Sequence, residues 1–411
     1  MQSVRRHGLS LVEVMIAMVM TLVVLGAMMA AFAYGSREMQ RGRGGIELNN
    51  RLITAEELLR RDLDRITVEL KPHHQLPTNP KGYVEIVDGA NIDYIAGNDL
   101  DTGGVSFPHG GNELVFGDRD DYFACTIQSN GKPFRGRFGN QIVESHLAEV
   151  VWFTVFDAST ADTSDVLLIR RQLLILPDLA VTAAAGTYSA FLANNDISVR
   201  REGGVLVPNS LTDLAVRGNR FSHLPATGNP AAEALEIVPL GVRFNDNHIM
   251  FSSVAAFDVQ VFAPDAGVNV ITDTLGTDVI DIAEPSDVGA NKTGAIVGTT
   301  AAISGAYVDL GKATGFLGSA MRSSANCNYA AAGQVLYDTG TSEYNRASVT
   351  GNGSDGFDDA GVGGVVDDWQ EQTSIAPYNT PIRGLQFTMR AIEPNTNQVR
   401  QLTVRKSFVL E

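Results

Sequence analysis

The first feature of the hydrophobic pattern is an apolar run near the start of the chain. From Leu9 to Tyr34, Glu13 is the only charged residue. An α-helix rises about 1.5 Å per residue, so about 20 apolar residues cross the hydrocarbon of a bilayer, and this run is longer than that. Arg5 and Arg6 precede it, and by the positive-inside rule they hold the N-terminus in the cytoplasm. We therefore predict a transmembrane helix over residues 9–34 that leaves the rest of the chain on the outer side of the membrane.

A second helical segment is predicted over residues 35–71. Between Gly35 and Gly45 the chain carries arginines and further glycines. Each glycine costs about 1 kcal/mol in a continuous helix, so we expect a bend or local melting there, with basic side chains able to meet lipid head groups. Apolar residues then return at helical spacing, at Leu52, Leu59, Leu63, Ile66 and Leu70. This pattern predicts an amphipathic helix that docks on a folded domain and ends at Pro72. We expect its apolar face to join the core of that domain rather than to form a coiled-coil seam.

The pattern then changes to short apolar runs separated by Gly, Asn, Asp and Pro, which is typical of strands and turns. Short candidate strands lie at Tyr83–Val87, Ile92–Ile95 and Glu113–Phe116. Two longer runs, Glu149–Phe156 and Leu167–Leu176, flank a polar loop and predict a hairpin. The second run contains Arg170 and Arg171. We interpret them as one solvent-facing arginine and one that covers an apolar edge, in preference to a phosphate site.

The last third of the chain contains a strand, a long polar segment and a second hairpin. Apolar and polar residues alternate toward the end of Phe251–Phe262, which predicts a half-buried strand that Pro264 ends. Residues 264–376 are rich in Gly, Ala, Thr and Asp, and we interpret them as an insertion or extended loop region. Two alternating runs, Ile382–Arg390 and Val399–Arg405, then predict a C-terminal hairpin.

These patterns together predict an α+β fold, in which a long N-terminal helix, transmembrane and then amphipathic, packs on an antiparallel β-rich C-terminal domain. The predicted parts are a leader (1–8), the membrane helix (9–34), its amphipathic continuation (35–71), a β-rich domain (72–263), a Gly/Asp-rich insertion (264–376) and a closing hairpin (377–411). Whether the insertion forms a domain of its own stays open.

The charge of the chain limits its partners. The net charge is −16, but residues 1–45 carry five arginines and two glutamates, or +3, which leaves −19 for the remainder. So acidic a region repels the phosphate backbone, and we expect no nucleic-acid partner.

The segment Gly351–Gly356 matches the G-x-G-x-x-G pattern, but no predicted strand precedes it and no helix follows it. We expect no catalytic role.

Glu13 is the most informative residue of the apolar run. A carboxylate inside a bilayer costs on the order of 2.5–3.5 kcal/mol and is retained only with a partner. Cleavage after Gly8 would create a new amino group on Leu9, about one helical turn from Glu13. That amine, in the same chain or in a neighbouring copy, is the expected partner. The alternative is a plain signal anchor, in which Glu13 lies near the membrane surface and its carboxylate snorkels to the interface.

The segment from Gly8 to Ala17, Gly-Leu-Ser-Leu-Val-Glu-Val-Met-Ile-Ala, resembles the prepilin signal of type IV pilins and type II secretion pseudopilins. The resemblance implies that a prepilin peptidase cleaves after Gly8 and methylates Leu9, a position that is usually phenylalanine in this family. It also implies that Glu13 is the buried acid of the family. The partners implied are other pilins or pseudopilins, the peptidase and inner-membrane lipid, with the C-terminal domain in the periplasm.

The β segments are loosely similar to the J-type minor pseudopilins of type II secretion and to PilW-type minor pilins. K-type tip pseudopilins usually lack an acid at the position of Glu13. The resemblance therefore implies a minor pseudopilin that primes or caps a secretion fibre. The alternatives are a PilW-type subunit of a type IV pilus, with roles in adhesion, motility or DNA uptake, and a signal-anchored periplasmic enzyme or ligand-binding protein.

Two further predictions concern the exported part. A Gly-rich segment carries Asp355, Asp358, Asp359, Asp367 and Asp368. Carboxylates on flexible turns suit calcium, and the alternative is a solvated acidic turn. The two cysteines, Cys125 and Cys327, fit no metal or redox spacing. In an oxidising periplasm they could form a disulfide, and the alternative is two separate buried thiols.

Overall fold

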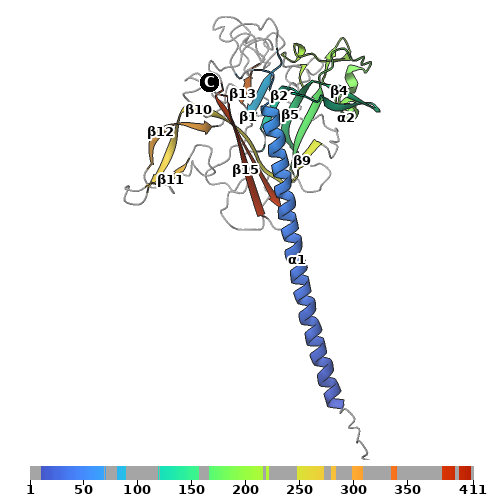
Figure 1. Cartoon of the computed structure of the whole chain (residues 1–411), viewed down its shortest axis with the longest axis vertical. Helices are drawn as coiled ribbons and strands as arrows, with labels where there is room; N and C mark the ends of the chain where they lie inside the picture. The colour runs from blue at the N-terminus through green and yellow to red at the C-terminus, as the bar shows by residue number, and fades with distance from the viewer. Residues whose placement is uncertain are drawn as a thin grey trace, which may run out of the picture.

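In the computed structural model, the molecule is a long helix with a β-rich domain built around its C-terminal end (Figure 1). The structure describes residues 11–68, 70, 81–88, 119, 121–156, 166–215, 219–221, 248–272, 279–283, 299–308, 335–339, 382–393 and 398–408. The predicted α+β class, with an N-terminal helix and antiparallel sheets, is confirmed. The strands predicted at Ile92–Ile95 and Glu113–Phe116 lie outside the described residues.

The described elements follow one another along the chain. They are α1 (Leu11–Leu63), β1 (Val84–Asp88), β2 (Tyr122–Gln128), β3 (Phe134–Phe138), β4 (Gln141–Ser145), β5 (Leu147–Phe156), β6 (Val166–Leu174), η1 (Ala185–Thr187), α2 (Tyr188–Asn194), β7 (Val199–Glu202), β8 (Val205–Pro208), η2 (Asp213–Ala215), β9 (Ile249–Phe251), β10 (Val254–Thr272), β11 (Val279–Ala283), β12 (Thr299–Val308), β13 (Val335–Asp338), β14 (Gly384–Glu393) and β15 (Gln398–Ser407).

The helix α1 differs from the prediction in two respects. It runs without a break from Leu11 to Leu63, so Gly35 and the glycines that follow do not melt a turn of the helix. It also ends at Leu63, nine residues before Pro72. The next residues turn, and Ile66 forms a β-bridge with Ile127 of β2 instead of extending the helix. Pairing with a strand at that point replaces the helical hydrogen bonds.

A six-stranded antiparallel sheet forms the centre of the domain, in the order β13-β1-β2-β5-β6-β9. The predicted hairpin is confirmed as β5 and β6, which pair from Phe156 and Val166 to Ala148 and Leu174. The edge strand β13 comes from the segment that we interpreted as an insertion, and it pairs with β1. Part of residues 264–376 therefore belongs to the main sheet, because β13 supplies backbone hydrogen bonds to an otherwise open edge.

A second sheet is built on the long strand β10, which pairs with β14, β11 and β12. The predicted C-terminal hairpin is confirmed, since β14 and β15 pair without a break from Gly384 and Ser407 to Glu393 and Gln398. Pro264 does not end β10, contrary to the prediction. The pairing with β12 shifts its register between Ala263 and Gly267, and such a bulge tolerates a residue that lacks a backbone N–H.

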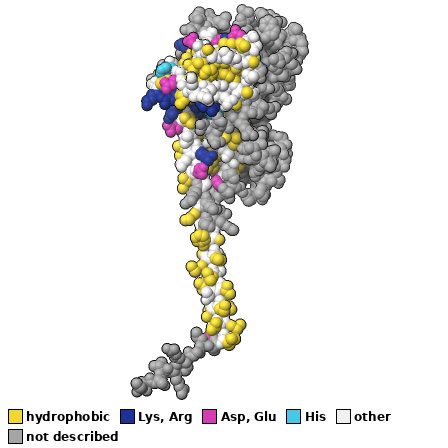
Figure 2. Space-filling view, turned by 90° about the vertical axis from the view of Figure 1, so that its right-hand side faces the viewer, with side chains coloured by type: hydrophobic (Ala, Val, Ile, Leu, Met, Phe, Trp, Pro, Cys, Tyr) yellow, Lys and Arg dark blue, Asp and Glu magenta, His cyan; other side chains and the backbone are white. Residues whose placement is uncertain are grey.

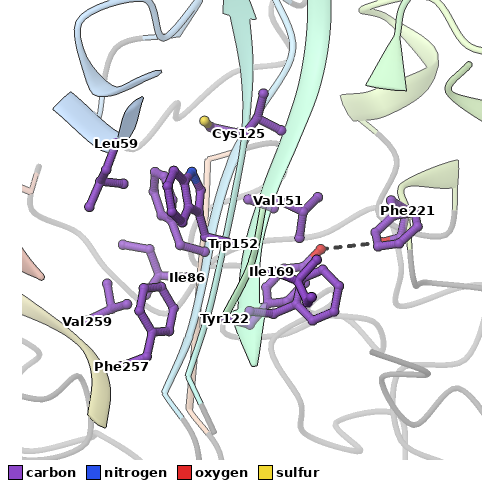
Figure 3. Packing of buried hydrophobic residues seen from close by; sticks show 14 of the residues in the cluster. Leu59, Ile86, Tyr122, Cys125, Val151, Trp152, Ile169, Phe221, Phe257 and Val259 are labelled. Carbon is purple, nitrogen blue, oxygen red and sulfur yellow. Dashed lines mark hydrogen bonds between the residues drawn. The ribbon is translucent and has the colours of Figure 1, made fainter. Parts of the chain in front are cut away.

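The hydrophobic core covers both faces of the six-stranded sheet, and on one face it lies between the sheet, the C-terminal half of α1 and the second sheet. The rings of Phe123 on β2 and Phe387 on β14 meet edge to face with centroids 5.0 Å apart. Figure 3 shows Leu59 of α1 beside Trp152, with Phe257 and Val259 of β10 on the same side of the sheet. The helix and the second sheet therefore cover the same face of the central sheet.

Candidate assembly helix and its anchorage

The N-terminal half of α1, Leu11–Gly35, is an apolar helix that the domain leaves uncovered. These 25 residues have a mean hydropathy of 2.5, and all of their side chains are exposed. At about 1.5 Å per residue they measure roughly 37 Å, which exceeds the ~30 Å of bilayer hydrocarbon. Figure 2 shows that hydrophobic side chains dominate this part of the stalk. The arrangement is that of a single membrane anchor near the start of the chain.

Glu13 lies in the first turn of this apolar half. Together with Val14, Ala17, Thr21 and a neighbouring leucine and methionine, it lines a shallow hollow on the helix surface. The hydroxyl of Thr21 donates a hydrogen bond to the carbonyl of Ala17 at 2.7 Å, so this polar group is satisfied within the helix. A carboxylate beside an apolar hollow suits contact with another helix better than contact with lipid.

The C-terminal half of α1 is docked on the domain. Its buried side chains recur at intervals of three or four residues, at Leu48, Leu52, Ala55, Leu59 and Leu63. They face β9, β14 and β15. The predicted amphipathic stripe is therefore confirmed as core, since Leu52, Leu59 and Leu63 are all buried. One helix thus joins an uncovered apolar half to a half whose apolar face is covered by its own domain.

Gly44 lies where α1 passes the end of β14. A Cβ atom at Gly44 would lie 2.6 Å from Oε1 and 2.9 Å from Cδ of Glu393, the last residue of β14. Gly45 lies against Gln398, the first residue of β15, with 3.7 Å from its ideal Cβ to Oε1. Among the glycines that we expected to bend the helix, Gly44 therefore leaves room for the side chain of Glu393, whereas a Cβ at Gly45 would make an ordinary contact. Gly42, by contrast, has no atom within 4 Å of its ideal Cβ position.

A buried ion pair fixes the end of α1 to the central sheet. Asp62 is only 2% exposed. Its two carboxylate oxygens accept hydrogen bonds from Nε and Nη2 of Arg170, at 2.8 and 2.7 Å, and Oδ2 also accepts one from Nε1 of Trp152 at 3.0 Å. Burial lowers the pKa of Arg170, but the charge of Asp62 and its hydrogen bonds with Arg170 together outweigh burial, so this pKa is raised above its usual value. We call Asp62, Trp152 and Arg170 the helix clasp.

Comparison with known protein families matches residues 4–29 to the prokaryotic N-terminal methylation motif. The chain carries a type IV pilin-like N-terminal signal. The motif includes Gly8, Leu9 and Glu13, and it covers the beginning of the uncovered apolar helix. It supports a pilin-like or pseudopilin-like class, processing by a prepilin peptidase, and other pilins as partners.

The signal spans 26 of the 411 residues, so the motif match does not reach the β domain. No curated protein and no solved structure matches the chain. Gly8 and Leu9 lie outside the described residues, so cleavage after Gly8, methylation of Leu9 and pairing of its amine with Glu13 stay predictions.

The sequence interpretation of Arg170 and Arg171 was wrong for both residues. Trp152 of β5 pairs with Arg170, and Val151 with Arg171, so the two arginines lie on opposite faces of the sheet. Arg170 enters the helix clasp. Arg171 donates to Oδ1 of Asp196 at 2.7 Å, and its side chain is 3% exposed. Neither arginine faces solvent. The missed signal was Asp62, an acid placed between the apolar positions of a helix stripe.

The far face of the central sheet carries a second buried polar network. Glu149 accepts hydrogen bonds from the hydroxyls of Tyr83 at 2.7 Å and Ser198 at 2.6 Å, and from the backbone N–H of Phe221 at 2.9 Å. Burial raises the pKa of Glu149, although the bond from Ser198 opposes the shift. Ser198 and Glu149 have the residue types of a nucleophile and base, but both are fully buried, so no substrate reaches them. The network stabilises the fold.

Next to this network, Arg220 and Glu85 form an ion pair of 2.7 Å with both side chains fully buried. The guanidinium of Arg220 also stacks on Tyr83, 4.0 Å from the ring centroid. These charges are therefore paired within the protein and are not available to a ligand.

The remaining predicted sites are only partly covered by the structure. Asp355, Asp358, Asp359, Asp367 and Asp368 lie outside the described residues, so the calcium site stays a prediction. The part of the chain that is described holds no group of three or more potential metal ligands. Cys125 is fully buried in β2. Cys327 falls outside the described ranges, so its disulfide with Cys125 also stays a prediction.

Proposed function

We propose that this chain is a non-catalytic minor pseudopilin. After removal of residues 1–8, its apolar half would anchor it in the inner membrane with the β domain in the periplasm. It would then leave the lipid to join a type II secretion fibre, which it helps to prime or cap. The observation that carries this proposal is a helix in which the methylation motif and Glu13 lie on an uncovered apolar half, while the other half is fixed in a folded domain.

The physical reason for assembly is the exchange of lipid for protein around the apolar half. Lipid tails are as apolar as leucine, so helix association there depends on close packing and on polar contacts. Glu13 provides such a contact if it meets the amino terminus created on Leu9 of its own chain or a neighbour. The acid at position 13 favours a J-type subunit over a K-type tip subunit by resemblance. A PilW-type subunit of a type IV pilus shares these features and is the second candidate.

The first test is the N-terminus of the mature protein. Mass spectrometry of the protein from producing cells is expected to find N-methyl-leucine derived from Leu9. An N-terminus at Met1, or one beyond Tyr34, would remove the basis of the proposal. Deletion of the candidate secretion and pilus systems one at a time then identifies the fibre that the protein joins, since its incorporation into that fibre depends on one of these systems.

The second test is Glu13→Ala, compared with Glu57→Ala as a matched control. Glu57 is exposed on the docked half and pairs with Arg61 at the surface. We expect both variants to insert into the membrane, since removal of the Glu13 charge favours insertion. Only Glu13→Ala is expected to be depleted from sheared fibres, by about tenfold, which corresponds to ~1.4 kcal/mol. Incorporation of both variants at the wild-type level would exclude a role for Glu13 in assembly.

A further inference from the structure

The buried guanidinium of Arg171 joins the central sheet to two other parts of the domain. Its Nη2 donates hydrogen bonds to the carbonyls of Leu192 and Asn195 at the C-terminal end of α2, both at 2.9 Å. Its Nη1 donates one to Oδ1 of Asp196 at 2.7 Å and lies 2.6 Å from Nε2 of His248. His248 directly precedes β9, the edge strand that pairs with β6. Arg171 therefore ties the end of α2 and the start of β9 to one point of the sheet.

The contact with Arg171 determines the protonation state of His248. A guanidinium carries only donors, so Nε2 of His248 must accept the hydrogen bond with its lone pair. The ring is therefore neutral, with its proton on Nδ1. A second proton, on Nε2, would place two donors 2.6 Å apart and add a positive charge beside the guanidinium. The closed contact requires neutral His248.

The charged groups around His248 oppose its protonation. Among the described residues they are Arg171 of β6, Asp196 after α2, Arg137 of β3 and, on the opposite face of the sheet, Arg170 of β6. Asp196 is the acid of this group. Its Oδ1 lies 4.0 Å from Nε2 of His248, and it already accepts hydrogen bonds from Arg171 and from the backbone N–H of Arg137. Burial, and then the charge of Arg171, lowers the pKa of His248 from 6.5 to about 4, although Asp196 acts in the opposite direction.

The two ends of β9 are held in different ways. The strand has three residues and pairs with β6 through Leu168 with Phe251 and Ile169 with Ile249, with a shift of register between these pairs. Phe251 is buried in the core and fixes the C-terminal end. Ile249 is only half-buried, and the residue before it is His248. Local opening of β9 therefore begins at its N-terminal end, where His248 contacts Arg171.

We propose that His248 is an acid-sensitive latch on the edge of the central sheet. Neutral His248 accepts a hydrogen bond from Arg171 and holds the N-terminal end of β9 against β6. When His248 takes up a proton from solvent, it leaves the guanidinium, and this end of β9 separates from β6. The backbone edge of β6 beside Ile169 is then open to pair with another strand. Arg171 keeps its bonds to Asp196 and to the end of α2, so α2 stays attached. The latch belongs to the β domain alone and does not depend on which fibre the subunit joins.

The latch gives local opening a pH dependence of known sign. Released His248 has the ordinary pKa of 6.5 and closed His248 a pKa of about 4, so the open form binds more protons between these values. The closed contact contributes its full stability above about pH 6.5, and this contribution falls as the pH drops toward 4. The open population is expected to rise by up to about tenfold per pH unit, or about 20-fold from pH 7 to pH 5.

The test is hydrogen exchange of the full-length chain in detergent at pH 7, 6 and 5, with rates corrected for the intrinsic pH dependence of exchange. The amides of β9 are compared with those of β2 and β5 at the centre of the same sheet. We expect β9 to be less protected than β2 and β5, and its exchange to be insensitive to low urea, because it opens locally. Its protection is expected to fall about 20-fold from pH 7 to pH 5. Protection of β9 equal to that of β2 and β5, or no fall with acid, would overturn the latch.

His248→Gln separates the latch from general effects of acid. The glutamine amide oxygen can accept the hydrogen bond from Arg171, but the side chain does not titrate. We expect the variant to keep the protection of β9 at pH 7 and to lose its fall toward pH 5. The matched control is His146→Gln, which replaces an exposed histidine beside Ser129 and is expected to keep the fall. A fall of wild-type size in His248→Gln would refute the latch.

A measurement on the wild-type chain decides the matter if His248→Gln does not fold. Exchange of the C2 hydrogen of each imidazole with deuterium, followed by mass spectrometry across the acid range, gives the pKa of His248 in the folded protein. We expect a midpoint below 6.5, the ordinary value for histidine. A midpoint of 6.5 or above would mean that the fold accommodates protonated His248 beside Arg171, and that acid does not release β9.

Discussion

Each half of α1 contains one informative carboxylate, and the domain buries one of them and leaves the other exposed. Asp62 is enclosed by its own fold, with a bidentate arginine and an indole N–H as partners. Glu13 lies on a half that the domain leaves wholly exposed. A charge held within the subunit contributes to folding. On the proposed function, the charge on the uncovered apolar helix contributes when lipid is exchanged for another subunit.

The same difference appears in the apolar side chains. Leu59 contacts the core of the domain, whereas Leu25 projects from a bare helix. Both halves nevertheless belong to one continuous helix. This comparison predicts that substitutions in the docked half change the stability of the domain, while substitutions in the apolar half change assembly and leave the domain folded.

The largest effect on stability is expected for Asp62→Ala. It leaves the guanidinium of Arg170 buried without its carboxylate, and loss of one partner of a buried pair costs about 3–5 kcal/mol. Urea denaturation of the detergent-solubilised protein, followed by far-UV circular dichroism, measures it. Glu13→Ala is expected to leave the same transition unchanged.

The double variant Asp62→Ala/Arg170→Ala sharpens this result. Because it removes both charges, its cost is expected to be smaller than the sum of the two single variants by about 1–3 kcal/mol. Strict additivity would mean that Asp62 and Arg170 do not act as a pair, and would contradict the helix clasp.

The clasp also shows where the sequence was informative and where it was not. Continuous apolar runs located the membrane half of α1 and the β5–β6 hairpin, and local periodicity located the docked half and the C-terminal hairpin, because each of these signals is local. The partner of Arg170 is Asp62, 108 residues earlier, and no local pattern connects them. The alternation of β6 did imply that Arg170 and Arg171 lie on opposite faces. It could not show that both faces are covered.

The glycines and the proline were misread for a related reason. Gly44 was assessed by its helix propensity alone, whereas its position is explained by Glu393 on a hairpin almost 350 residues later. Pro264 was treated as the end of a strand, but a bulge in the pairing with β12 accommodates it. Within the functional site, residues 8–13 could be identified because that signal is contiguous.

Leu59→Ala is expected to have the next largest effect. Leu59 is fully buried against the central sheet, and truncation of a buried leucine to alanine costs about 2–5 kcal/mol. The matched control, Leu25→Ala, removes the same atoms from an exposed position of the same helix, and its effect on unfolding is expected to stay within about 0.5 kcal/mol. The urea midpoint measures both. A similar loss in the two variants would contradict the division of α1 into an assembly half and a docked half.

The smallest effect separates two glycines that lie two residues apart in α1. Gly42→Ala meets no atom within 4 Å, so it is expected to gain the helix propensity of alanine, about 1 kcal/mol. Gly44→Ala gains the same propensity but brings its Cβ to 2.6 Å from Oε1 and 2.9 Å from Cδ of Glu393, so the side chain of Glu393 must move and part of the gain is lost. Hydrogen exchange of the α1 amides around residues 42–48 is expected to slow in Gly42→Ala and to stay the same or quicken in Gly44→Ala. Equal protection in both variants would show that the hairpin does not rest against the helix, and that α1 is docked only from Leu48 onward.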